Sequence, residues 1–195
     1  MLNRLKGDES LMLAYQQGDS SAFESLYKRH KDGLFAFLYR SCRQEAVVEE
    51  LAQDAWMSVI NKAGTYQPTA KFKTYLYQIA HNKLVDHWRR SKNFSRVALE
   101  EADLASNDTS VEDQRIAEQR LQSLGQAIHK LPGEQRDVFL LREEGFSQEQ
   151  IAQIVGVGKE TVKSRLRYAS NHLRTMLEES IQGMGDPASA KGAEQ

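Results

Sequence analysis

The chain has 195 residues, enough for one medium-sized domain or two small ones. Apolar residues make up 40% and charged residues 27% of it, and the mean hydropathy of −0.61 favours a cytoplasmic protein. No stretch approaches the roughly 20 apolar residues that a bilayer-spanning helix needs, and the N-terminus lacks the apolar core of a secretory signal. We therefore expect no direct membrane insertion. A lone cysteine, Cys42, excludes an internal disulfide and a multi-cysteine metal cluster.

The net charge of −1 conceals two strongly basic stretches. Residues 83–96 hold five Lys and Arg against Asp86 alone, and residues 159–174 hold five against Glu160 alone, so each stretch has a net charge of +4. Local patches of this kind are typical of nucleic-acid contacts. The alternative for either patch is a solvated helix face with no partner.

Apolar residues recur at helical spacing, and no stretch alternates as a half-buried strand does, so the sequence predicts an all-α fold. None of the three prolines interrupts an apolar repeat. The predicted helices cover residues 9–17, 20–43, 45–62 and 71–90 in the first half, and 111–130, 132–144, 147–155 and 159–179 in the second.

The periodicity stops between these two groups of helices, where residues 93–111 are polar and acidic. We interpret that stretch as a flexible acidic linker between two small helical domains. The predicted domains cover residues 9–92 and 112–180, and the small, polar residues 181–195 are predicted to form a disordered tail.

The helix predicted over residues 45–62 displays an aromatic side chain beside polar and acidic ones: Glu50, Gln53, Asp54 and Trp56. Such a mixture suits a protein–protein interface better than a solvated surface. The alternative is that Trp56 belongs to the core, because Ala55 and Val59 also claim the inward face.

The loop and helix that follow interleave aromatic rings with cations. When the nucleotides of a bound DNA strand are unstacked, aromatic rings can stack on the bases while Lys and Arg side chains contact the phosphates. The capture of a flipped base then offsets the free energy that unstacking costs. However, Phe72, Leu76 and Ile79 are spaced like core residues, so we expect at least half of the aromatics to be partly buried. The aromatics are Tyr66, Phe72, Tyr75, Tyr77 and Trp88, and the cations are Lys62, Lys71, Lys73, Lys83, Arg89 and Arg90.

The most specific local pattern is a helix-turn-helix over residues 146–169. Ser147 and Gln150 have the spacing of a capping box, and Gly156 stands where a helix end commonly needs a left-handed residue. The second helix buries an apolar stripe of Val162, Leu166, Ala169 and Leu173. Its other face presents Lys159, Glu160, Thr161, Lys163, Ser164, Arg165 and Arg167.

That second helix has the composition of a recognition helix, with side chains able to reach base edges at its start and basic residues further along. The alternative is an ordinary helical hairpin with a basic surface. A helix-turn-helix alone does not distinguish a repressor from a transcription initiation factor.

Patterns of enzymatic sites are missing from the sequence. The five histidines show no zinc-peptidase spacing, and no glycine-rich phosphate loop ending in Gly-Lys-Ser/Thr is found. We therefore expect no catalytic residue, no metal and no cofactor.

Motifs over residues 10–180 resemble domains 2 and 4 of the sigma-70 family, in the family's order. The motifs are GDSSAFESLY from Gly18, EELAQDAW from Glu49, FKTYLYQIAHN from Phe72, DHWRR from Asp86, LP at Leu131, LLR from Leu140, and TVKSRL from Thr161. No room remains for domain 3, which points to the extracytoplasmic-function (ECF) group.

The resemblance implies a transcription initiation factor with core RNA polymerase, promoter DNA (duplex and melted) and an anti-sigma protein as partners. Glu50, Gln53, Asp54 and Trp56 would bind the clamp helices of the largest polymerase subunit. Its regulon would concern stress or the cell envelope, and an anti-sigma partner would account for retention at the inner membrane.

The same resemblance distributes the DNA contacts over both domains. Residues of the first domain would bind the minus-ten element, with the loop 67–73 as its reader: Lys62, Tyr66, Lys71, Lys73, Asn82, Asp86, Arg89 and Arg90. Residues of the second would bind the minus-thirty-five element: Arg142, Lys159, Glu160, Thr161, Lys163, Ser164, Arg165 and Arg167.

Two positions depart from the family pattern. Tyr168 stands where many members have a basic residue before the alanine, and Gly158 stands where Ser or Thr often caps the recognition helix. Two further hypotheses stay open at this point. One is a stand-alone helix-turn-helix regulator with an N-terminal effector domain, and the other is an interaction protein that binds no DNA.

Overall fold

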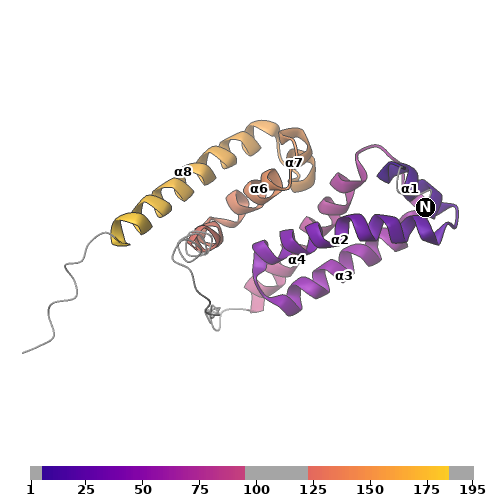
Figure 1. Cartoon of the computed structure of the whole chain (residues 1–195), viewed down its shortest axis with the longest axis horizontal. Helices are drawn as coiled ribbons and strands as arrows, with labels where there is room; N and C mark the ends of the chain where they lie inside the picture. Colours follow the sequence, from indigo (N-terminus) through magenta and orange to yellow (C-terminus); the bar gives the residue numbers. More distant parts are fainter. Residues whose placement is uncertain (1–5, 95–122, 185–195) are drawn as a thin grey trace, which may run out of the picture.

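The computed structural model describes residues 6–94 and 123–184, and within these ranges all regular structure is helical (Figure 1). This confirms the predicted all-α class. The first module contains α1 (Asp8–Gln16), α2 (Ser20–Cys42), α3 (Glu45–Asn61), the short 3-10 turn η2 (Ala63–Thr65) and α4 (Phe72–Phe94). The second contains a helical segment over residues 123–130, then α6 (Gly133–Glu143), α7 (Gln148–Val155) and α8 (Lys159–Met184).

Two helices extend beyond their predicted ends. α4 continues to Phe94, two residues into the predicted linker, and α8 continues to Met184, four residues into the predicted tail. Neither proline nor a pair of glycines follows Arg90 or Glu179 closely enough to end the helix at the predicted point. The remaining predictions for 95–111, for the helix start at 111–122 and for the tail from 185 fall outside the described residues.

The start of α2 depends on a side-chain cap. The N-cap is Asp19, whose carboxylate Oδ1 accepts hydrogen bonds from the amides of Ser21 (3.0 Å) and Ala22 (3.3 Å). An N-cap of this kind satisfies helix amides that have no partner in the first turn. At the other end Arg43 adopts the left-handed conformation, with φ of 54°, which turns the chain into α3.

α2, α3 and α4 enclose the core of the first module, and α1 lies across one end of the bundle (Figure 1). Leu26, Phe37 and Leu38 of α2 are completely buried. Leu11 and Met12 of α1 are also completely buried, which fixes this short helix to the bundle. Burial of each such side chain stabilises the fold by roughly 1.5–3 kcal/mol relative to exposure.

The second module has a small core of its own, where Ala127 and Leu131 pack against Ala169 and Leu173 of α8. The main hydrophobic cluster continues from the first module into the second, through Phe146 and Ile151. α7 packs on α4, and α6 packs on α2. The two predicted domains are therefore in direct contact, which the predicted flexible linker did not suggest.

Glu144, just after α6, is the centre of the polar contact between the modules. Its side chain is only 13% exposed and pairs with the guanidinium of Arg40. Its Oε2 accepts a hydrogen bond from the Tyr77 hydroxyl at 3.0 Å, and its main-chain carbonyl accepts one from Lys73 Nζ at 2.7 Å. A lysine at the C-terminal end of a helix is also favoured by the helix dipole.

Three more side-chain bonds cross the same interface. Gln150 Nε2 donates to Thr74 Oγ1 at 3.2 Å, and Gln78 Nε2 donates to the carbonyl of Gln153 at 3.2 Å. His81 Nε2 lies 3.2 Å from Asp137 Oδ2. The contact between the modules thus combines a continuous apolar cluster with several polar bonds.

Replacing Glu144 should loosen this contact. Glu144→Ala removes the carboxylate that Arg40 and Tyr77 share and leaves Lys73 only the main-chain carbonyl, so we expect a larger separation of the modules in solution. Small-angle scattering, or energy transfer between dyes on α3 and α8, measures that separation. Glu143→Ala, at the exposed neighbouring position, is the matched control. Equal dimensions for the two variants would contradict a holding role for Glu144.

Candidate nucleic-acid and polymerase interfaces

The helix-turn-helix has the caps that its sequence predicts. Ser147 Oγ accepts from the Gln150 amide at 3.2 Å, and Gln150 Oε1 accepts from the Ser147 amide at 2.9 Å. Gly156 ends α7 with φ of 71°, in the left-handed region where a side chain is strained. The capping box and the left-handed glycine are therefore both confirmed, and they fix where α8 begins.

An exposed ion pair links the two helices across this turn. Lys159, the first residue of α8, bonds to the carboxylate of Glu149 in α7. That bond, with backbone and Ser147 hydrogen bonds, lowers the pKa of Glu149 to about 2. Both groups are thus charged at neutral pH. Because exposed pairs are weak, Lys159 can exchange this partner for a phosphate at little cost.

The predicted recognition face of α8 is largely open to solvent. Lys163 is exposed and lies 3.9 Å from Glu160, while Arg167 places its guanidinium 5.2 Å from the ring centre of exposed Tyr168. Ser164 is half-buried. The exposed members of the predicted set on this helix are Lys159, Glu160, Thr161, Lys163 and Arg167.

Arg165 differs from its neighbours on α8. Its side chain is 21% exposed, and its Nη2 lies 2.5 Å from Glu134 Oε2 of α6. The sequence did not predict this pairing, because the two residues are 31 positions apart. Arg142, on α6, is exposed and donates from Nη1 to the carbonyl of Phe146 at 3.2 Å.

The loop between α3 and α4 separates exposed cations from a buried tyrosine. Lys62 and Lys71 are exposed at its two ends, and residues 67–69 are exposed between them. Tyr66, expected beside a captured base, is only 6% exposed and packs edge-on against Phe72 and Tyr75. In this conformation Tyr66 is therefore not accessible to a base. By contrast, Phe72 is buried as its core-like spacing predicted, and Tyr77 is buried as well.

The hydroxyl of Tyr66 is buried and has no hydrogen-bond partner among the described residues. Burial, with a contribution from the nearby Glu9 carboxylate, raises the pKa of this hydroxyl to about 12. A buried polar group without a partner is unfavourable in a folded protein. Unfavourable groups of this kind are retained mainly at functional sites.

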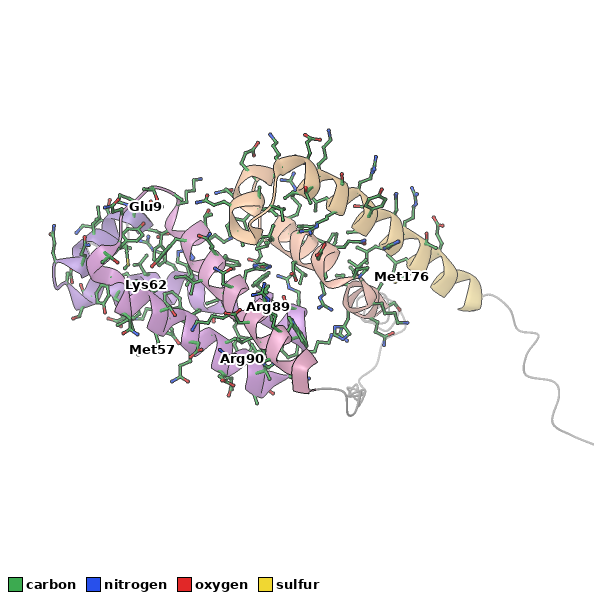
Figure 2. The ribbon with its side chains drawn as sticks, turned by 180° about the vertical axis from the view of Figure 1, so that it is seen from behind. Glu9, Met57, Lys62, Arg89, Arg90 and Met176 are labelled. Carbon is green, nitrogen blue, oxygen red and sulfur yellow. The ribbon has the colours of Figure 1, made fainter. Side chains whose placement is uncertain are left out.

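Further along α4, four polar residues share one stretch of helix surface. Asn82, Asp86, Arg89 and Arg90 are all exposed, and their spacing places the first three on one face. Asp86 Oδ1 and Arg89 Nη1 lie 3.6 Å apart. Figure 2 shows Arg89 and Arg90 far along α4 from the end where Lys62 lies. The predicted minus-ten residues therefore extend over much of the helix.

Lys73 is the exception among the predicted DNA-binding residues of α4. It is engaged by Glu144 and lies above the rings of Tyr77 and Phe146, at 5.4 and 4.8 Å from their centres. In this conformation Lys73 is bound to the second module and its side chain remains 36% exposed. The pKa of Tyr77 is raised by burial first and then by the Glu144 carboxylate, so its hydroxyl stays a hydrogen-bond donor.

An apolar groove of about 440 Å³ runs between α2 and α3. Tyr27 and Met57 line it while remaining 41% and 46% exposed. Trp56 also lines the groove but is only 6% exposed, packed edge-on against Phe23 and Tyr27 at 5.8 and 5.1 Å. The core alternative for Trp56 is thus the better description of most of its ring.

The polar residues of α3 that were predicted to bind polymerase are accessible. Glu50, Gln53 and Asp54 are exposed on α3, and Gln53 lines the groove. Asp54 Oδ2 lies 3.4 Å from Lys83 Nζ of α4, which sequence reasoning missed. It also missed Met57 and Phe35 as lining residues, since a single exposed methionine or phenylalanine has no distinctive sequence pattern.

Comparisons with known proteins assign this geometry to a family. Residues 26–94 match the model of sigma-70 region 2, and residues 121–173 match the model of sigma-70 region 4. The chain is 31% identical over 173 residues to the ECF RNA polymerase sigma factor SigM of Mycobacterium tuberculosis, covering 88% of this chain and 85% of that protein. The chain belongs to the ECF sigma factors of the sigma-70 family. It is thus a factor of promoter-directed transcription initiation.

Other relatives agree with this assignment. The sigma factor CarQ of Myxococcus xanthus is 31% identical over 170 residues, covering 86% of this chain and 96% of CarQ. The sigma factor RpoE of Bartonella quintana, solved in complex with the anti-sigma factor NepR, superposes with a TM-score of 0.66 at 25% identity, covering 80% of this chain and 96% of RpoE. The structure of CnrH in complex with the cytosolic domain of CnrY, at 22% identity and a TM-score of 0.67, covers 89% of this chain and 99% of CnrH and shows the same fold.

The family departures noted in the sequence have visible consequences. Gly158 provides no side-chain cap, and α8 begins with the main-chain carbonyl of Gly158 accepting from the Val162 amide at 3.1 Å. Tyr168 offers a ring to Arg167 in place of a charge. No helix in the described part of the chain is long and apolar enough to cross a bilayer.

Removing the Tyr66 hydroxyl tests whether it is truly without a partner. Tyr66→Phe should raise the free energy of unfolding by about 1 kcal/mol, because it removes an unpaired buried polar group. Since the folded-state pKa of Tyr66 exceeds its unfolded value, the wild type should also lose stability as pH rises from 10 towards 12, and Tyr66→Phe should lose less. Urea denaturation at pH 7.5 and pH 11 measures both effects. A destabilised variant at pH 7.5 would contradict this description.

Proposed function

We propose that this sigma factor docks on core RNA polymerase through the groove between α2 and α3, and binds promoter DNA with one surface on each module. One observation supports the proposal most strongly. The DNA-facing residues of α4 and α8 and the apolar groove are separate surfaces, so polymerase and DNA do not compete for the same residues. We further propose that the chain has no catalytic activity of its own.

The groove is suited to a helical partner. Its aromatic and methionine side chains supply apolar contact area, Gln53 in its lining provides a polar contact, and Glu50 and Asp54 are exposed elsewhere on α3. Methionine is adaptable and aromatic residues frequently dominate binding energy. These features support docking on the clamp helices of the largest polymerase subunit.

α8 is proposed to enter the major groove of the minus-thirty-five element. Thr161 and Glu160 near its start would contact base edges, with Ser164 beside them. Lys159, Lys163 and Arg167 would contact phosphates or guanine acceptors, and Arg142 would add a backbone contact from α6. Arg165 would have to leave Glu134 to reach DNA, so its contribution would be reduced by the energy of that pair.

The loop and α4 are proposed to bind the minus-ten element as single strand. Lys62 and Lys71 would hold phosphates on either side of the loop, while Asn82 and Asp86 would contact the captured base. Arg89 and Arg90 would follow the backbone further along α4. Tyr66 would participate once the loop rearranges, and its unpaired hydroxyl is consistent with a partner that arrives only with DNA.

Promoter binding would require the two modules to separate. Elements centred roughly 25 base pairs apart lie roughly 85 Å apart along B-form DNA, whereas α7 packs directly on α4 in the described conformation. Separation would release Lys73 from Glu144, so that the Lys73 ammonium group could contact DNA. We propose that polymerase provides the binding energy for this opening.

We propose a cytoplasmic location and an anti-sigma partner. The Bartonella relative was solved with an anti-sigma factor, which supports a partner of that class here. Retention of the factor at the inner membrane would then depend on the topology of the anti-sigma protein.

Run-off transcription with core polymerase tests the proposed function. The template is a library of duplexes randomised over the minus-ten and minus-thirty-five positions, and the transcripts are sequenced. We expect transcripts whose templates are enriched in one motif at the minus-ten and one at the minus-thirty-five position. Core polymerase alone and the factor alone should produce no such transcripts. A stand-alone helix-turn-helix regulator would bind selected duplexes without producing a transcript, which would overturn the proposal.

A charge placed in the groove should prevent docking. Met57→Glu puts a carboxylate against apolar and aromatic groups, so the affinity for core polymerase should fall at least tenfold, a loss of about 1.4 kcal/mol. Fluorescence titration with core enzyme measures it. Ala46→Glu adds the same charge to an exposed position of α3 outside the groove and should bind normally. Equal affinities would contradict docking at this groove.

Lys163 tests the recognition helix. Lys163→Ala should weaken binding of the minus-thirty-five duplex. If Lys163 contacts only phosphate, affinity should fall similarly for all sequences, and the slope of log affinity against log salt concentration should decrease by about 1. Electrophoretic shifts at several salt concentrations measure both effects. Lys130→Ala, at an exposed lysine before α6, is the control. A Lys163 variant with the wild-type slope would argue against a phosphate contact.

A further inference from the structure

We propose that Glu9 and Gln16 of α1 are positioning residues for promoter recognition, because together they hold both ends of the loop that is proposed to bind the minus-ten element. The inference rests on the proposed function of that loop. Neither residue was among the predicted site residues, and the minus-ten surface described above lies entirely on the segment from Lys62 onward.

Gln16 holds the start of the loop. Its Nε2 donates to the carbonyl of Gly64 at 2.9 Å and lies 3.4 Å from the carbonyl of Tyr66. These carbonyls belong to the segment that turns from η2 into the exposed residues 67–69. One amide group therefore fixes the main chain on both sides of Thr65 just before the proposed reading segment.

Glu9 holds the end of the loop. Its Oε1 accepts a hydrogen bond from the amide of Phe72 at 2.7 Å, at the first residue of α4. The amides of a first helical turn have no partner inside the helix, so this carboxylate acts as a cap supplied by another helix. Figure 2 shows Glu9 at the same end of the first module as Lys62.

The geometry of α1 makes these two contacts a pair. Glu9 and Gln16 are seven residues apart, so they lie on one face of the helix, two turns and roughly 10 Å from each other. α1 itself is fixed by the buried side chains of Leu11 and Met12, and by Asp8, whose carboxylate pairs with Arg29 at 2.7 Å and His30 at 2.8 Å. A rigid helix thus sets the distance between the two ends of the loop.

A fixed distance between its ends limits the conformations of a loop that has no regular structure of its own between η2 and α4. The exposed side chains at 67–69 and at Lys71 are presented in one arrangement, which reduces the entropy lost on binding a base. Loss of either contact should therefore reduce discrimination between bases at the minus-ten element. Contacts of α8 with the minus-thirty-five element should not change.

Gln16 and Gln17 provide a matched pair for the test. Both are exposed at the end of α1, and Gln16 carries the two side-chain bonds to the loop, whereas Gln17 bonds through its main-chain amide. Gln16→Ala and Gln17→Ala are compared with wild type on the promoter that the wild-type factor selects from the randomised library. Single-base changes are made at each minus-ten and minus-thirty-five position.

We expect Gln16→Ala to lower discrimination at minus-ten positions about threefold to tenfold, with minus-thirty-five discrimination, core affinity and melting temperature as in Gln17→Ala. For Glu9, the Glu9→Gln variant keeps an acceptor oxygen and should retain most discrimination, while Glu9→Ala should lose it. Retained discrimination in Glu9→Gln would show that Glu9 acts by accepting the Phe72 hydrogen bond, and not through a general contribution of its charge to folding.

Two results would overturn the inference. One is equal minus-ten discrimination in Gln16→Ala and Gln17→Ala, and the other is a loss that affects all positions, or core binding, to the same extent. Failure of the proposed function has a different signature, because the wild-type factor would then select no promoter from the library and no variant would be compared.

Discussion

The packing of α4 on both of its sides is the constraint on which the rest of the structure depends. One side of this helix packs on α2 and α3 within the first module, and α7 of the second module packs on it as well. Tyr77 illustrates the double role, since its ring contacts Phe37 of α2 and Phe146 of the second module. The helix proposed to bind the minus-ten element therefore also contributes much of the contact between the modules.

The chemistry of that contact explains how one chain accommodates both roles. An interface built from apolar side chains alone would be costly to open, because its whole area would be exposed to water. Here the apolar contact is accompanied by hydrogen bonds that involve Thr74, Gln78, His81 and Lys73. Water, polymerase or DNA can replace those partners, so the net free energy of opening is smaller than the number of bonds suggests. A factor that changes partners during initiation is consistent with such an interface.

The charged residues divide into those already satisfied and those that await a partner. Lys73, Arg165 and Lys83 are held by carboxylates of neighbouring helices, whereas Lys62, Lys71 and Arg167 are exposed. Each internal pair lowers the gain from a phosphate contact, because the existing partner must first be released. Under the proposed function, the internal pairs would weaken binding to DNA in general and leave more of the affinity to contacts made in the polymerase complex. Local geometry, with Glu9 and Gln16 at the two ends of one loop, adds a source of specificity that charge cannot provide.

The sequence by itself determined what depends on near neighbours in the chain. The all-α class, the Ser147–Gln150 capping box and the left-handed Gly156 follow from local spacing, and the motifs from Gly18 to Leu166 carry the resemblance to the sigma-70 family; the structure and the comparisons agree with them. The tertiary structure alone decided which distant groups meet: the burial of Tyr66 and Trp56, the pairing of Lys73 with Glu144, and the contacts of α1 with the loop. Helical periodicity identifies an apolar or a polar face but not the surface that it will contact. A charged or aromatic residue is therefore assigned to solvent, core or partner only once the helices are packed.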